Sequence, residues 1–594
     1  MKKVFKLLLP YWWMLILIIG TTSIGVWSSL QLPTMMSNIV NKGIVGQDQS
    51  YIWQEGFGMI GVTIIGAIAI VCSGLLASRI GTGWSKKLRL ATFAKVESFS
   101  QNEINQFSTA SLITRSTNDI QQIQQTSIMI LRMSLQAPIM AVGAIISALN
   151  TAPKLSWIMA VGVVALLFVV AAMFVLLLPK FQIVQKLVDQ LNLVSRENLT
   201  GLRIIRAFRN EKYEEAKFTK ANDELTGINL WINRAMSSMF PLITLIINFI
   251  TLGVIWFGAS EIANNSLQVG NMMAFMQYAL QVIMAFMFLA VLMIFIPRAQ
   301  VSIKRIGEIL NTDDSIKFRE ADDKLREKLD PSRKGLVEFR DVTFSYPDAE
   351  TPVLSDISFS AKPGETTAFI GSTGSGKSTL VNLIPRFYDT TAGEILIDGA
   401  NVKNLTQSDL TDALGYVPQK GVLFSGTVES NIKYGAPKIN QSEVEQVAEV
   451  AQADFIKDLD KKFQSHIAQG GSNVSGGQKQ RLSIARALAK DPEILIFDDS
   501  FSALDYATDA KLREDLKKFA KAKTMIIVAQ RISTIKDAEQ IIVLDDGKID
   551  SIGTHYDLLN RSEVYREIAS SQFAETEMKD ELKAAKAFAK KGEK

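Results

Sequence analysis

The sequence predicts a helical membrane domain followed by an α/β domain. Six long apolar runs fill the first 300 residues, and from about residue 310 the composition is that of a soluble α/β protein. The glycine-rich string "GSTGSGKST", residues 371–379, joins a strand-like segment to a helical one. A chain of 594 residues is also too long for one compact domain. We therefore expect a transmembrane domain over 1–315, a linker over 316–335, an α/β domain over 336–575 and a charged tail over 576–594.

The six apolar runs each have about the length that crosses a bilayer, which is roughly 20 residues for a helix. The third run is the weakest, because Arg132 and Gln136 interrupt it. The first run continues well past Gly20 without a cleavage site, so we expect a retained membrane helix. Six such runs argue against the buried helices of a soluble protein. They span residues 14–40, 56–80, 128–150, 155–179, 236–260 and 268–297.

The connections between the runs alternate in length and charge. The segments after the second and fourth runs are long and rich in Lys and Arg, whereas the other connections are short and poor in both. The positive-inside rule then predicts a multi-pass protein of the cell membrane with both termini in the cytoplasm. The long segments are too polar for lipid, and we expect them to be helical extensions of the spans.

The string at 371–379 is the P-loop pattern, in the strand–loop–helix context that the pattern requires. Glycines let backbone amides wrap phosphates, Lys377 supplies charge to them, and the Ser378 hydroxyl can bind magnesium. ATP and Mg²⁺ are therefore the expected cofactors. Tyr346 of "FSYP" can stack on adenine through its ring face. The predicted nucleotide-binding residues are Tyr346, Gly371, Ser372, Thr373, Gly374, Ser375, Gly376, Lys377, Ser378 and Thr379.

A second candidate element is the apolar run "ILIF", which ends in two carboxylates, Asp498 and Asp499. In a site that splits ATP, the first carboxylate holds magnesium and the second activates water. Gln419 of "YVPQ" can reach the magnesium or the attacking water. The predicted metal ligands are therefore Ser378, Gln419 and Asp498.

The string "NVSGGQKQRLSIARAL", which begins at Asn473, opens a helix with a serine and two glycines. The Ser475 hydroxyl and the first backbone amides form a second anion-binding helix start. A simple helix cap explains Ser475 but not the whole string. Because the P-loop already cradles the phosphates, a second cradle suggests contact with another face of ATP.

The order of P-loop, "YVPQ", "SGGQ", "ILIFDDS" and "SALD" resembles the nucleotide-binding domain of ATP-binding cassette (ABC) proteins. Six spans ahead of it resemble the half-transporters of the type IV ABC exporter family. Soluble DNA-repair ATPases also carry an "SGG" string, but the six spans exclude them, and no nucleic acid partner is expected. "RSTNDI" (115–120) and "ENLTGLRIIRAF" (197–208) look like the cytoplasmic loops of that family that touch the ATPase domains.

The resemblance implies a dimer that alternates between inward-open and outward-open states. ATP would lie between the P-loop of one subunit and the signature of the other, so closure on ATP drives substrate outwards. The signature residues that would contact the partner's ATP are Ser475, Gly476, Gly477 and Gln478. The D-loop would consist of Ser502, Ala503, Leu504 and Asp505.

The sequence departs from the family pattern at the catalytic positions. Asp499 stands where the family usually has glutamate, and its carboxylate would sit roughly 1–1.5 Å short of the water, against a reach of about 2.6–3.2 Å. Such a displacement can cost on the order of 100-fold in rate. Gln530 stands where the family usually has histidine and carries no positive charge near neutral pH. Gln469 replaces a usual acidic residue before the signature. The predicted catalytic residues are thus Asp499 and Gln530, both atypical, and Gln419.

These departures weaken hydrolysis and leave ATP binding intact. They resemble the degenerate-site subunit of heterodimeric bacterial multidrug ABC exporters, whose partner carries Glu and His. Hydrophobic small molecules are the expected cargo, and the Met- and Phe-rich sixth run suits them, although a lipid-facing role explains it equally well. A drifted but active homodimer, a lipid or peptide exporter, and a nucleotide-gated regulatory membrane protein stay open as alternatives.

Overall fold

The structure is a computed structural model that describes residues 2–347 and 349–592, so the last two residues of the predicted tail lie outside the described residues. The chain divides into two compact units. The first comprises Met1–Glu97 and Ser108–Thr312, and the second comprises Ser98–Phe107 and Asp313–Lys594. A short piece of the long segment after the second span therefore belongs with the carboxyl-terminal half.

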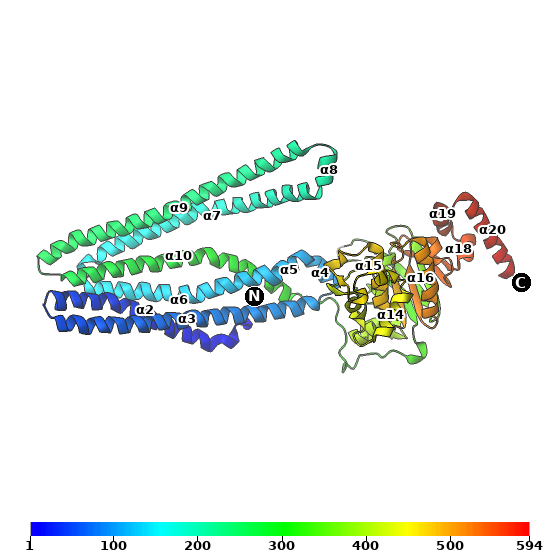
Figure 1. The fold of residues 1–594 in the computed structure, drawn as a ribbon, viewed down its shortest axis with the longest axis horizontal. Helices are drawn as coiled ribbons and strands as arrows, with labels where there is room; N and C mark the ends of the chain where they lie inside the picture. Colours follow the sequence, from blue (N-terminus) through cyan, green and yellow to red (C-terminus); the bar gives the residue numbers. More distant parts are fainter. Residues whose placement is uncertain (1, 348, 593–594) are drawn as a thin grey trace. The chain divides into compact units, whose positions relative to one another are not determined.

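The first unit is a bundle of long helices (Figure 1). In the described residues, six helical stretches are long and apolar enough to cross a membrane, and each contains one of the predicted spans. The fold class predicted for this half is confirmed. The helices are α1 (Lys2–Lys6), α2 (Trp12–Asn38), α3 (Gln49–Glu97), α5 (Thr109–Thr114), α6 (Ile120–Thr151), α7 (Ser156–Thr200), α8 (Leu202–Ala207), α9 (Glu211–Ala263) and α10 (Val269–Asn311).

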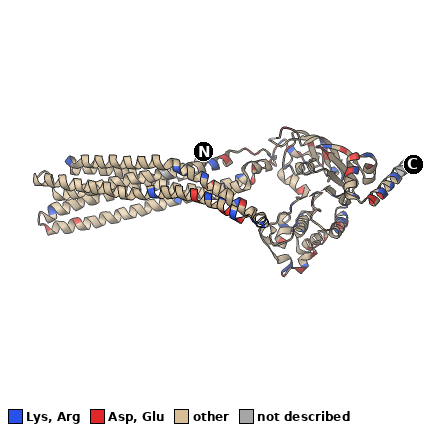
Figure 2. Ribbon diagram, turned by 90° about the horizontal axis from the view of Figure 1, so that it is seen from above, with Lys and Arg blue, Asp and Glu red and all other residues tan. Residues whose placement is uncertain are grey.

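The polar segments between the spans continue the membrane helices. Helix α3 runs on to Glu97, α7 runs on to Thr200, and α9 begins at Glu211, well before its apolar part. Helices α7 and α9 pack side by side and are joined by α8 (Figure 1). Charged residues are sparse along the middle of the bundle and gather towards its ends (Figure 2). Continuous helices suit this setting, because a helix satisfies its own backbone hydrogen bonds in lipid.

Small residues let the membrane helices approach one another. A Cβ at Gly162 of α7 would lie 2.1 Å from Cδ1 of Ile250 on α9, so a larger residue there would force Ile250 to move. The large rings Phe275 and Tyr278 of α10 are fully buried. The buried Tyr278 hydroxyl has a hydrogen-bond partner within the bundle, since it donates to the carbonyl of Leu30 at 3.0 Å. The outer surface is apolar, as a lipid-facing surface requires.

The segment 115–120 packs against α10 within the first unit. Arg115 begins a π-helical turn, Arg115–Asp119, and donates to Glu308 at 2.8 Å. Asp119 accepts from Ser302 at 2.9 Å. The neighbouring helix α4 (Gln101–Phe107) belongs instead to the second unit, where Asn105 hydrogen-bonds the hydroxyl of Tyr388.

The second unit is built on two large sheets, beside which β7 and β8 form a small antiparallel pair. One has the order β2-β1-β4-β5, and the other has the order β12-β11-β3-β10-β9-β6 with a parallel centre and an antiparallel edge. Its strands are β1 (Val337–Phe344), β2 (Leu354–Ala361), β3 (Thr366–Gly371), β4 (Ala392–Ile397), β5 (Ala400–Asn401), β6 (Leu414–Val417), β7 (Gly426–Thr427), β8 (His466–Ile467), β9 (Ile494–Asp498), β10 (Thr524–Val528), β11 (Gln540–Asp545) and β12 (Lys548–Gly553).

The larger sheet is covered on both faces, so its central strands are apolar over most of their length. Every residue of β9 is buried. Ile494 and Ile496 enter the core shared with the smaller sheet, and Leu495 and Phe497 enter the core shared with the helices. The helices are α11 (Lys377–Leu383), α12 (Gln407–Ala413), α13 (Val428–Ile432), α14 (Gln441–Val450), α15 (Gly476–Leu488), α16 (Tyr506–Phe519), α17 (Ile532–Ile535), α18 (His555–Arg561), α19 (Glu563–Gln572) and α20 (Glu575–Gly592).

The segment predicted as a linker is hydrogen-bonded to the α/β unit. Asp398, buried at the turn between β4 and β5, accepts the N–H groups of Gly335 at 2.7 Å and Leu336 at 3.0 Å with a single oxygen. Burial raises the pKa of Asp398 to about 6, and the neighbouring Glu493 carboxyl adds to the rise. Arg326 makes a two-pronged contact with Asp409. The chain therefore enters its first strand along a fixed path.

Candidate functional site

The predicted site residues meet at one edge of the larger sheet. Strands β3, β10, β9 and β6 are parallel neighbours, so their carboxyl ends lie along the same edge. The P-loop follows β3, Asp498 ends β9, and Gln530 and Gln419 each lie two residues beyond their strands. Ligands bind outside the carboxyl ends of the strands in open α/β sheets, and the strand order alone places these groups there.

The P-loop owes its shape to two glycines with left-handed backbone angles. Gly374 and Gly376 have φ of +92° and +93°, which residues with a Cβ rarely adopt. A Cβ at Gly376 would also lie 2.7 Å from Cδ2 of Leu354. The loop therefore turns tightly into α11 and leaves backbone N–H groups free for an anion.

Lys377 lies over the loop that it belongs to. Its ammonium donates to the carbonyls of Gly371 at 2.9 Å and Ser372 at 2.6 Å. Burial lowers the pKa of the Lys377 ammonium, and the carboxylates of Asp499 and Asp498 offset part of that change. Lys377 thus brings a positive charge to the place where the loop would hold phosphates.

Ser378 and Asp498 form a pair of oxygen ligands suited to magnesium. The Ser378 hydroxyl donates to Oδ1 of Asp498 at 2.8 Å, and Asp498 is 4% exposed. Burial raises the pKa of Asp498, the hydrogen bond from Ser378 opposes that rise, and the charge of Asp499 adds to it. Adjacent ligands of an octahedral Mg²⁺ ion lie about 2.9 Å apart, so the two oxygens fit such an ion. A bound Mg²⁺ would neutralise charge on the phosphates during transfer.

Asp499 is held by two glutamine amides. Its Oδ2 accepts the amide N–H of Gln530 at 2.8 Å and that of Gln419 at 3.1 Å. The residue is 7% exposed and has a left-handed φ of +47°. Strained backbone of this kind persists where the surroundings hold it. The structure thus brings the three predicted catalytic residues together, and Gln419 contacts Asp499 through its amide nitrogen.

Tyr346 lies beside the helix that follows the P-loop. Its hydroxyl hydrogen-bonds Oγ1 of Thr379 at 3.0 Å, and its ring meets Phe344 and Tyr388 edge-on, with interplanar angles of 81° and 90°. Three aromatic rings therefore gather at the entrance of α11. Stacking of Tyr346 on adenine stays a prediction.

The signature string begins α15 with a reciprocal cap. The Ser475 hydroxyl accepts the N–H of Gln478 at 3.3 Å, and Oε1 of Gln478 accepts the N–H of Ser475 at 2.9 Å. Ser475 is exposed and Gln478 is half-buried. Gly477 lies against the D-loop, since a Cβ there would be 3.3 Å from the carbonyl of Ala503. Asp505, at the end of the D-loop, caps α16, because its carboxylate accepts the N–H of Thr508 at 3.0 Å.

Sequence reasoning missed one residue that ties these motifs together. Gln480, two residues beyond the signature, is 2% exposed. Its side chain donates to the carbonyl of Pro418 at 3.1 Å and accepts from the N–H of Gly421 at 3.2 Å. It therefore fixes the segment that carries Gln419 to the signature helix. Its place inside the quoted signature string was the only sequence signal for it.

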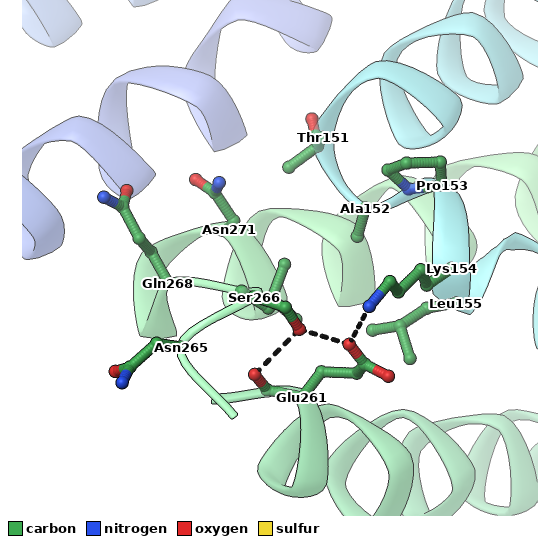
Figure 3. A pocket seen from close by; sticks show the side chains of 11 residues that line it. Thr151, Ala152, Pro153, Lys154, Leu155, Glu261, Asn265, Ser266, Gln268 and Asn271 are labelled. Atoms are coloured by element: carbon green, nitrogen blue, oxygen red, sulfur yellow. Dashed lines mark hydrogen bonds and ion pairs between the residues drawn. The ribbon is translucent and has the colours of Figure 1, made fainter. Parts of the chain in front are cut away.

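A separate cavity of about 460 Å³ lies in the first unit, where the connection between α6 and α7 meets that between α9 and α10 (Figure 3). Lys154 donates to Glu261 at 2.7 Å, and Ser266 donates to the same carboxylate. Asn271 lines the cavity and accepts from Ser37 at 2.7 Å. The contacts of Lys154 and Ser266 with Glu261, which we call the polar tie, join the α6–α7 connection to the α9–α10 connection at the end of the bundle.

Both halves of the chain match known families. Residues 15–286 match the family described as ABC transporter transmembrane region, and residues 354–502 match the family described as ABC transporter. An uncharacterized ABC transporter ATP-binding protein of Mycobacterium tuberculosis is 40% identical over 574 residues, which cover 95% of this chain and 96% of that protein. The uncharacterized ABC transporter ATP-binding protein YfiB of Bacillus subtilis is 37% identical and covers 96% and 99%.

Two further relatives carry more specific descriptions. The ATP-dependent lipid A-core flippase of Hahella chejuensis is 30% identical, over 88% of this chain and 89% of the flippase. The solved structure of a bacterial Atm1-family ABC exporter with ATP bound is 26% identical, with a TM-score of 0.78 over 95% of this chain and 98% of that one. The chain therefore belongs to the ABC exporter family, as a half-transporter in which an ATP-binding domain with an ATPase coupled to transport is fused to six membrane helices.

Proposed function

We propose that this chain is one half of an asymmetric heterodimeric exporter of hydrophobic or amphipathic compounds. Its own site binds ATP with Mg²⁺ through Ser378 and Asp498 but hydrolyses the ATP slowly. The partner subunit carries Glu and His where this chain has Asp499 and Gln530. ATP held at the slow site keeps the dimer closed for longer than one catalytic cycle of the other site.

The observation that carries the proposal is the environment of Asp499. A general base must accept a proton from water, and Oδ2 of Asp499 already accepts two amide N–H groups. Only the other oxygen is left for water, on a side chain one methylene shorter than the usual glutamate. The amide of Gln530 adds no positive charge to stabilise the transferred phosphoryl group. Each feature favours ATP retention over turnover.

The signature supports the second part of the proposal. Ser475 and the glycines after it begin α15 at an exposed helix start, which suits contact with an anion from another molecule. The string itself has no departure like those at Asp499 and Gln530. In the heterodimer, this chain would therefore complete the active site on the partner's P-loop.

The decisive experiment compares phosphate release by the purified chain with that of its pair with a partner subunit. A candidate partner is a half-transporter encoded next to this chain, with Glu after its magnesium aspartate and His at the switch. We expect the chain alone to be slow and the pair to be faster and stimulated by hydrophobic drugs. An isolated chain as fast as the pair would refute the asymmetric assignment.

A second cargo class is favoured by one relative. The Hahella protein is described as a lipid A-core flippase, and 30% identity over most of both chains makes lipid export the main alternative. Proteoliposomes that contain a fluorescent lipid distinguish the two cargoes. ATP-dependent lipid movement that hydrophobic drugs neither slow nor compete with would favour lipid.

The proposal includes an orientation in the cell membrane. The domain limits at 315, 335 and 575 also belong to the proposal. Both termini and the basic helical extensions are cytoplasmic, and the short connection at 264–268 faces outwards, because Lys and Arg concentrate in the extensions. A Cys72→Ser chain with one new cysteine at Asn265 should react with an impermeant thiol reagent in intact cells, and one with the cysteine at Ser570 should not.

A further inference from the structure

The segment that carries Gln530 is held by groups outside every motif of the sequence. Strand β10 ends at Val528, and the chain then turns into α17, which has only four residues. Arg531 stands at the N-cap of α17, but its side chain makes no capping hydrogen bond. The first N–H groups of a helix lack partners within the helix, so a short helix of this kind needs an external cap.

Gln572 supplies that cap. It is the last residue of α19, and Oε1 of its side chain accepts the N–H of Ile532 at 2.8 Å. Its amide nitrogen donates to the carbonyl of Gln530 at 2.7 Å. One side chain thus bridges the backbone on both sides of Arg531. Two contacts of opposite polarity fix both the position and the direction of this turn.

Helix α19, which carries Gln572, is packed firmly against the rest of the second unit. Tyr565 and Ala569 are fully buried in the core that covers the sheet. Ser562 caps α19 by accepting the N–H of Tyr565 at 3.1 Å, and its hydroxyl donates to Asp550 of β12 at 2.6 Å. Gln572 therefore acts from a helix that is anchored to the sheet.

The other end of α17 is held by α20. Lys536, which follows the last residue of α17, forms an ion pair with Glu581. His555 also lies 3.4 Å from that carboxylate. Burial raises the pKa of Glu581, but the hydrogen bonds and charges of Lys536 and His555 outweigh it and keep that pKa below its ordinary value. Asn560 fixes α20 further along by donating to the carbonyl of Ala585 at 2.8 Å.

We propose that Gln572 is a positioning residue for the ATPase site, and that α19 and α20 together clamp the segment 530–536 so that the side chain at position 530 stays beside residue 499. Within the described residues, Gln572 acts through the backbone of Gln530 and makes no hydrogen bond with Asp499 itself. The C-terminal helices, which carry no catalytic motif, would then set the turnover of the site. Since Gln572 is exposed, water competes for both hydrogen bonds, and the clamp can be released.

The inference rests on the proposed function in one respect only, which is the choice of a second parent chain for the ATPase assay. In the Asp499→Glu, Gln530→His chain we expect faster hydrolysis, which makes a change in rate easier to measure. If that double variant is no faster than the natural chain, the proposed function fails. The clamp is tested separately, by comparing each background with and without the change at Gln572.

The test is the Gln572→Met chain, since methionine has the length of glutamine but makes neither hydrogen bond. In the double variant, where glutamate at 499 and histidine at 530 act in hydrolysis, we expect kcat to fall about 10-fold, with KM for ATP unchanged because the P-loop is not touched. In the natural chain, where Gln530 occupies an acceptor oxygen of Asp499, kcat should not fall. Gln572→Glu keeps an acceptor for the N–H of Ile532 and should lose less. The matched control is Ser571→Ala, which removes only a hydrogen bond to Ile568 within α19 and should leave kcat unchanged.

Two results would overturn the clamp. One is a kcat for Gln572→Met within twofold of its parent in the double variant. The other is a parallel loss of ATP affinity and unfolding temperature, which a merely structural role would give. If Gln572→Met does not fold, Glu581→Gln tests the same inference from α20. In the double variant it weakens the ion pair with Lys536 and should lower kcat at unchanged KM, and an unchanged kcat would count against the proposal.

Discussion

Replacing Asp499 with glutamate should raise the ATPase rate of this chain. In the structure, the Asp499 carboxylate is drawn to Gln530 at 2.8 Å and Gln419 at 3.1 Å. Glutamate adds one carbon–carbon bond of about 1.5 Å and lets the carboxylate reach past these amides towards water. Misplacement by about 1 Å can cost on the order of 100-fold, so recovery of a tenth to all of that gives a rise of about 10- to 100-fold in kcat.

The assay is phosphate release by the purified chain in lipid nanodiscs at saturating Mg-ATP. KM should change little, because Lys377 and the loop that it covers are untouched. The Lys377→Ala chain gives the background from contaminating ATPases. If Asp499→Glu leaves kcat where it was while ATP still binds, the short side chain is not what slows the site.

Three further outcomes follow from the structure. Ser378→Ala should weaken ATP binding at least 10-fold in magnesium and leave binding in EDTA unchanged by calorimetry, and an equal loss in both would exclude a metal role. The pKa of Asp398 is about 6 in the fold against 3.8 ordinarily, so stability present below pH 4 is lost as pH rises through 6, by about 3 kcal/mol. Asp398→Asn keeps the acceptor for two backbone N–H groups, and its unfolding temperature should fall less between pH 5 and 8 than that of the natural chain, whereas a slope as steep as that of the natural chain would contradict this. Lys154→Ala removes an exposed ion pair to Glu261 and should shift the unfolding temperature of the detergent-solubilised chain by less than about 2 °C, so a larger drop would show that the polar tie is structural.

The spans and the P-loop could be predicted because their signals are local. About 20 consecutive apolar residues are stable mainly inside a bilayer, and each predicted span lies within a long apolar helix to within about two residues at its ends. The P-loop glycines and Asp498 could be found in the same way, since a strand end and a tight turn are written in neighbouring residues. The parallel order of β3, β10 and β9 then brought them to one edge.

The arrangement around Asp499 could be predicted only in part. The sequence identified Asp499, Gln530 and Gln419 separately, but not that two amides share a single oxygen. Gln419 lies 80 residues before Asp499, and Gln530 lies 31 residues after it. A contact between distant positions depends on the packing of the whole sheet, which no local pattern encodes.

Gln572 lay beyond prediction for a different reason. A glutamine at the end of a polar helix has no motif, and its function depends on where that helix docks. The sequence predicts only a charged tail over 576–594. The structure forms α20 over Glu575–Gly592, with Ala585 fully buried. Docking of this kind rests on a few contacts, such as that of Glu581 with Lys536, that sequence spacing does not reveal.

The identity of the bound nucleotide tests the central claim most directly. The purified chain is mixed with Mg-ATP, separated from free nucleotide after a time in which a fully active ABC site would turn over many times, and its bound nucleotide is analysed. We predict that ATP stays bound to the natural chain and that ADP replaces it in the Asp499→Glu, Gln530→His chain. Bound ADP in the natural chain at the same time point would contradict a site built to hold ATP.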